Sequence, residues 1–119
     1  MNTEIGIILG YAFSFFVTFL CIALIFFVRI RRKMLIVLFP AYTFGLIVLW
    51  ATLLAHEVIL NGILPLILNV VLIVLFWYLR FVSLSYGNER KRLIIYLFAE
   101  TGRSIMLLSL LTLVLLLLF

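Results

Sequence analysis

Four long runs of apolar residues, separated by short segments that carry most of the charge, constrain this sequence more than any other feature. The runs cover about residues 5–28, 34–56, 63–86 and 89–119 of a 119-residue chain. A helix needs about 20 apolar residues to cross a bilayer, so each run is long enough to span one. The connections are too short to form a soluble domain. The sequence therefore predicts an all-α integral membrane protein with a single domain of four transmembrane helices.

The composition excludes a water-soluble fold. Apolar and aromatic residues make up 69% of the chain and charged residues 11%, whereas soluble domains are about 45–50% apolar and about 25% charged. Because Cys21 is the single cysteine, an internal disulfide and a CxxC redox pair are both excluded. A single histidine, His56, excludes bis-histidine haem ligation within the chain. No catalytic or metal-binding motif is evident, so we expect a protein that is not an enzyme and has no cofactor.

The basic residues predict how the helices are oriented. They form one cluster between the first two runs and another between the last two: Arg29, Arg31, Arg32 and Lys33, then Arg90, Lys91 and Arg92. Basic loops remain on the cytoplasmic side of a membrane. We therefore expect two short basic cytoplasmic loops, with both termini and the turn from His56 to Gly62 external. The net charge of +5 then reflects topology and contact with anionic lipid headgroups, not binding to nucleic acid.

Local signals predict the helix ends around the second and third loops. Asn61-Gly62 supplies a turn, and Pro65 fits the first turn of the third helix, where its missing N–H does no harm. Gly87 is typical of a helix terminator and Asn88 of the N-cap of the fourth helix. The third helix is therefore expected to continue to Tyr86.

A stripe of small residues predicts a helix-packing face on the first run. Its members recur every four residues: Gly6, Gly10, Ser14 and Thr18. Small side chains allow transmembrane helices to approach closely. The stripe contacts either a helix of a different subunit or the second helix of this chain, where Ala41/Gly45 and Ala51/Ala55 form shorter small-residue pairs.

Several polar residues fall inside the apolar runs and are candidate functional residues: Asn69, Arg80, Glu100 and Arg103. Glu100 and Arg103 are three residues apart, so they share a helix face and can pair. If residues 88–119 form one long helix, Glu100 and Arg103 are expected to form a charged cluster. Arg80 of the neighbouring helix either joins this cluster or extends its long side chain to the cytoplasmic headgroups. Such a cluster either holds the third and fourth helices together or binds an anionic lipid headgroup or a partner subunit. Asn69 needs a hydrogen-bond partner on another helix.

Two further expectations concern the ends of the second and fourth runs. His56 and Glu57 are expected to face water on the external side. Residues 88–104 form either the start of one long transmembrane helix or a separate helix on the cytoplasmic surface, and Gly102 permits a bend in both cases.

These features favour an accessory or structural subunit of a larger membrane complex that packs through the small-residue face of the first helix. The alternative is a homo-oligomeric small transporter or channel, in which polar residues of the third and fourth helices line the path. Membrane lipids, other membrane subunits and further copies of the chain are the expected partners. The prokaryotic cytoplasmic (inner) membrane is the expected location, with an endomembrane as the second choice.

Overall fold

The computed structural model describes residues 2–27, 31–59, 63–85 and 87–118, and within them it is all-helical. The elements are α1 (Asn2–Phe27), α2 (Arg32–Ile59), α3 (Leu64–Ser83) and α4 (Glu89–Leu118). Each of the four is long and apolar enough to cross a membrane. The prediction of an all-α membrane protein with four such helices is confirmed. The predicted positions Arg29, Asn61, Gly62 and Tyr86 lie outside the described residues.

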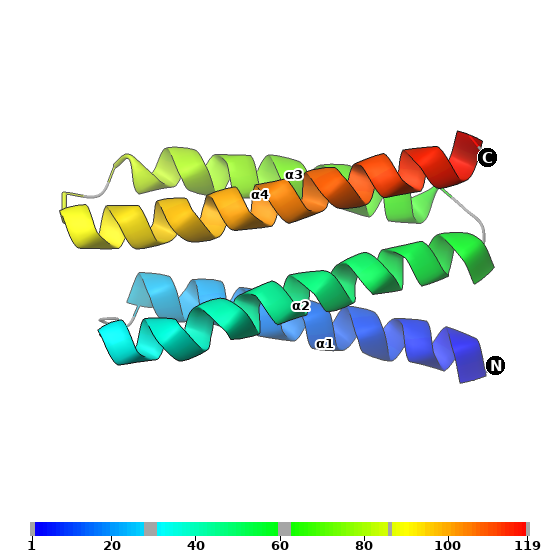
Figure 1. Ribbon diagram of the computed structural model, residues 1–119, viewed down its shortest axis with the longest axis horizontal. Helices are drawn as coiled ribbons and strands as arrows, with labels where there is room; N and C mark the ends of the chain where they lie inside the picture. The colour runs from blue at the N-terminus through cyan, green and yellow to red at the C-terminus, as the bar shows by residue number, and fades with distance from the viewer. Residues whose placement is uncertain (1, 28–30, 60–62, 86, 119) are drawn as a thin grey trace.

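The helices run antiparallel in chain order and form two hairpins (Figure 1). Within the described residues, α1 packs on α2 and α3 packs on α4, while α2 and α4 join the hairpins and α1 does not contact α3. Both termini lie at one end of the bundle, together with the end of α2 and the start of α3 (Figure 1). The opposite end, called the basic end below, contains the start of α2 and the start of α4, with their Arg and Lys residues.

The small-residue stripe of α1 packs against α2 of the same chain. A methyl group added at Gly10 would lie 2.5 Å from the Thr52 hydroxyl oxygen, and one added at Gly45 would lie 3.2 Å from the Thr18 hydroxyl oxygen. Ser14 and Thr18 are fully buried. Gly6 is exposed, with no atom within 4 Å of an added methyl group. Two of the four stripe residues, Gly10 and Thr18, therefore contact the chain's own second helix, and Ser14 between them is fully buried.

A second close contact joins α2, α3 and α4 in the middle of the bundle. The buried Tyr42 hydroxyl donates a hydrogen bond of 2.8 Å to the Phe98 carbonyl oxygen. A methyl group added at Gly102 would lie 2.5 Å from the Tyr42 hydroxyl oxygen and 2.6 Å from the Phe76 ring. Gly102 therefore allows three helices to meet. Gly102 does not interrupt the helix, because α4 is continuous from Glu89 to Leu118.

The continuity of α4 decides between the two arrangements expected for residues 88–104. A separate surface helix requires a break before the membrane-spanning part, and α4 has none between Glu89 and Leu118. Its 30 residues correspond to a length of about 45 Å at 1.5 Å per residue. The whole bundle measures 45 Å along its longest axis, so α4 extends along its entire length.

The ends of α3 and α4 confirm some of the local signals and correct one. Pro65 lies in the first turn of α3, and the Asn88 side chain accepts a hydrogen bond of 3.1 Å from the Arg90 N–H, as an N-cap does. However, α3 ends at Ser83, before the predicted stop at Gly87. The hydroxyls of Ser83 and Ser85 donate to carbonyl groups of the last turn, which satisfies these groups without further helix.

Candidate functional site

Arg80, Glu100 and Arg103 form an ionic cluster on the surface where α3 and α4 meet. Arg103 Nη2 lies 2.7 Å from Glu100 Oε2 and donates a hydrogen bond to it. Arg80 Nε of α3 lies 3.2 Å from the other carboxylate oxygen, Oε1. The contact with Arg80 is an ion pair without a directed hydrogen bond, because Glu100 Oε1 has no hydrogen-bond partner. One carboxylate thus holds two guanidinium groups from two helices.

The ionic cluster is half-buried and carries an excess of positive charge. The side chains of Arg80, Glu100 and Arg103 are 39%, 24% and 26% exposed. The Arg80 guanidinium also lies over the Tyr96 ring, 5.5 Å from its centroid, a distance at which cation and ring attract. Two positive groups and one negative group leave a net charge of +1 at a position open to the surroundings. The arrangement can therefore both tie α3 to α4 and attract an anion.

Asn69 lies in the core and is bound to α4. Its side-chain N–H donates a hydrogen bond of 2.8 Å to the Ser109 hydroxyl oxygen, and both residues are fully buried. The carbonyl oxygen of the same side chain, Oδ1, has no partner among the described residues. The structure therefore does not place Asn69 in the ionic cluster; it forms a separate polar contact between α3 and α4.

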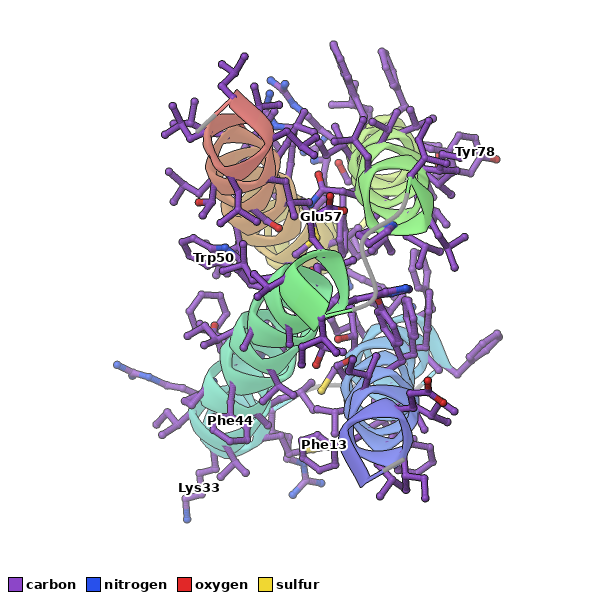
Figure 2. All side chains as sticks on the ribbon, turned by 90° about the vertical axis from the view of Figure 1, so that its right-hand side faces the viewer. Phe13, Lys33, Phe44, Trp50, Glu57 and Tyr78 are labelled. Carbon is purple, nitrogen blue, oxygen red and sulfur yellow. The ribbon has the colours of Figure 1, made fainter. Side chains whose placement is uncertain are left out.

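The expectation that His56 and Glu57 face water is wrong for Glu57, which is buried, while His56 is half-buried. His56 Nδ1 is hydrogen-bonded to the Tyr11 hydroxyl of α1 at 2.7 Å. Glu57 is only 4% exposed, and it lies at the end of α2 on the side of α3 and α4 (Figure 2). Its Oε2 has no partner among the described residues. Packing of the bundle around the end of α2 buries Glu57, an effect that its neighbours in the sequence do not reveal.

The basic clusters lie at one end of the bundle. Arg31, Arg32 and Lys33 are exposed, and Lys33 extends away from the helices (Figure 2). Arg90 is exposed as well, whereas Arg92 is half-buried. The Lys91 ammonium group donates a hydrogen bond of 2.7 Å to the Phe26 carbonyl oxygen at the end of α1. This contact satisfies a terminal carbonyl group of α1 and ties the start of α4 to the first hairpin.

A groove beside the ionic cluster was not foreseen from the sequence. It has a volume of about 230 Å³ and is lined by Trp77, Arg80, Phe81 and Leu84. These residues share one face of α3, and that spacing is the only sequence signal for the groove. Among the described residues, no group of three or more His, Cys, Asp or Glu side chains is placed to hold a metal ion.

Comparison with known proteins gives no match: no protein-family model fits the chain, and neither a curated protein nor a solved structure is significantly similar to it. The four apolar helices define a small multi-pass membrane protein.

Proposed function

We propose that this chain is a non-enzymatic accessory or structural subunit of a larger membrane complex. The observation that supports this function best is the use of polar side chains as ties between the chain's own helices. Tyr11 is bound to His56 between α1 and α2, Tyr42 to α4, and Asn69 to Ser109 between α3 and α4. Interhelical hydrogen bonds of this kind stabilise membrane bundles by about 0.6 kcal/mol each on average.

Helix continuity also favours a structural role over transport. Secondary transporters commonly form their substrate site from discontinuous helices whose unwound backbone binds the substrate. Within the described residues, each of the four helices is unbroken. Glycines at tight contacts, Gly10, Gly45 and Gly102, add close packing to the polar ties. A bundle held in this way suits a subunit that presents a fixed surface to its partners.

Because α2 already contacts Gly10 and Thr18, and Ser14 is fully buried, we place the partner surface away from this part of the α1 stripe. The basic end is proposed to face the cytoplasm, since it contains two clusters of Arg and Lys residues. In that orientation both termini are external. The proposed location is a prokaryotic inner membrane.

A homo-oligomeric transporter or channel is the second candidate, and Glu57 favours it. A carboxylate that is 4% exposed and has an unpaired oxygen is unusual for a purely structural residue. Asn69 carries a second buried and unpaired oxygen, Oδ1, on the adjacent helix α3. In this function the two oxygens are contact points for a transported cation or proton. Glu57→Gln then abolishes flux while the assembly remains intact.

The mass of the native assembly distinguishes the two functions. The tagged full-length chain is expressed at its natural level, extracted with a polymer that retains surrounding lipid, and measured by native mass spectrometry. A subunit co-purifies with other chains at a fixed stoichiometry, and Glu57→Gln does not change that stoichiometry. A homo-oligomer without other chains would contradict the subunit proposal. Flux measurements on Glu57→Gln in reconstituted vesicles would then test the second candidate.

A further inference from the structure

The groove on α3 offers the two kinds of contact that a phospholipid makes where its headgroup begins: an apolar surface and a positive charge. Trp77, Phe81 and Leu84 provide an apolar wall, and Arg80 provides a guanidinium group at the same place. Trp77 is 49% exposed and Phe81 is 64% exposed, so the groove opens to the outside of the bundle. An acyl chain fits the apolar wall, and a phosphate fits the guanidinium.

The ionic cluster next to the groove lacks hydrogen-bond acceptors. Each guanidinium carries five N–H groups, and among the described residues Glu100 is the one carboxylate that contacts Arg80 and Arg103. Arg80 makes no directed hydrogen bond to that carboxylate, and Arg103 Nε is buried with no acceptor in the part of the chain that the structure describes. An additional anion would pair with the net charge of +1 and accept hydrogen bonds from these donors. A phosphate oxygen has both properties.

The position of Arg80 along α3 matches the depth of a lipid headgroup. The 20 residues of α3 span about 30 Å, which equals the thickness of the hydrocarbon core. Arg80 is three residues before the last residue of α3, hence about 5 Å from that end. Its long side chain bridges this distance to the headgroups. Trp77 and Tyr96 are aromatic residues of the kind enriched at this boundary.

We propose that this groove binds one anionic phospholipid, with its phosphate on the Arg80 guanidinium and an acyl chain along Trp77, Phe81 and Leu84. The excess positive charge selects an anionic lipid over a zwitterionic one, whose own cationic group neutralises its phosphate. The proposal holds for a subunit and for a transporter, so it does not depend on the function proposed above.

Quenching of Trp77 fluorescence by brominated lipids tests the proposal on the full chain. The sequence contains two tryptophans, so Trp50→Phe leaves Trp77 as the sole reporter. The protein is placed in lipid discs with equal amounts of phosphatidylglycerol and phosphatidylcholine, and bromine is carried on the acyl chains of one lipid or the other. We expect phosphatidylglycerol to be preferred at Trp77 about fivefold, as one basic side chain near an anionic surface confers.

Matched variants assign this preference to the groove. Arg80→Gln is expected to reduce the fivefold preference to about one, whereas Arg80→Lys, which keeps the charge, retains most of it. Arg32→Gln removes an exposed positive charge at the same end without touching the cluster, and it leaves the preference unchanged. Equal quenching by both lipids in the protein that carries only Trp50→Phe would overturn the proposal, whatever the variants of the ionic cluster show. Protection of Trp77 from both lipids would also overturn it, because it would mean that protein covers the groove.

Discussion

Replacing Gly102 by alanine tests the packing of three helices at one point. The added methyl group would lie 2.5 Å from the Tyr42 hydroxyl oxygen and 2.6 Å from two carbons of the Phe76 ring. Real carbon contacts are not this short, so something must move. Both neighbours are rigid aromatic side chains in the core, with exposures of 0% for Tyr42 and 2% for Phe76. Relief therefore requires the helices to separate or the Tyr42 ring to give up its hydrogen bond to Phe98.

Three terms determine the size of the effect of Gly102→Ala. Overpacking a well-packed core costs about 1–3 kcal/mol. Loss of the Tyr42 hydrogen bond to the Phe98 carbonyl adds about 0.6 kcal/mol, the average for such bonds in membranes. The higher helix propensity of alanine returns about 0.8–1.0 kcal/mol. We expect Gly102→Ala to lower the free energy of unfolding by about 0.6–2.8 kcal/mol.

Unfolding in mixed micelles with increasing dodecyl sulfate, followed by tryptophan fluorescence, measures this change. Gly6→Ala is the matched control, because an added methyl group there meets no atom within 4 Å; it should be neutral or stabilising by at most about 1 kcal/mol. In a Tyr42→Phe background the hydroxyl is absent, and Gly102→Ala should cost at least about 0.5 kcal/mol less than in the parent. Equal stabilities of the Gly102→Ala and Gly6→Ala proteins would refute the reasoning.

Two further substitutions on α4 have controls on the same helix. Ser109→Ala removes the acceptor of the Asn69 hydrogen bond and should lower the free energy of unfolding by about 0.6 kcal/mol, at most about 1.7; Ser104→Ala, at an exposed position, should have no effect. Glu100→Gln leaves two guanidinium groups without a counter-charge and should cost about 1 kcal/mol at this partly exposed site. Glu89→Gln, exposed in the first turn of α4, should change stability by less than about 0.5 kcal/mol. The same micelle titration measures the stability of all four variants. If Ser109→Ala were as stable as its control, the hydrogen bond from Asn69 would be contradicted, and the same result for Glu100→Gln would contradict the ion pairs of Glu100.

The length of the apolar runs and the spacing of charged residues made some features of the bundle predictable. Apolar run length is enough to predict four helices, because crossing a bilayer requires it. The spacing of Glu100 and Arg103 predicts their ion pair, since residues three apart share a helix face. Asn69 required a partner, but its identity did not follow, because Ser109 meets it only in one register of α3 against α4. The role of Tyr42 was missed as well, although Tyr42 precedes Leu46, which is also fully buried, by one helical turn.

The burial of a residue near a helix end could not be predicted from its neighbours in the sequence. Glu57 is two residues before the last residue of α2 as the structure has it and was expected to face water. Its burial depends on how the second hairpin packs beside α2, which is a property of the whole bundle. Single-sequence patterns describe faces of one helix, and they contain no information about which helix covers a given face.

The point at which α3 ends determines how deep in the membrane the ionic cluster lies. The positions of its residues in the sequence determine this depth less. Measured from the charged start of α4, Glu100 lies about 16 Å along the helix, a distance that suggests deep burial in the membrane. Its carboxylate, however, pairs with Arg80, and the backbone of Arg80 lies only about 5 Å from the end of α3, which is ten residues shorter than α4 and ends at Ser83. If α3 spans the hydrocarbon, the first turns of α4 lie outside it, and the ionic cluster lies at the headgroup level. The cost of charge in the membrane is then small, and an anionic lipid can reach Arg80.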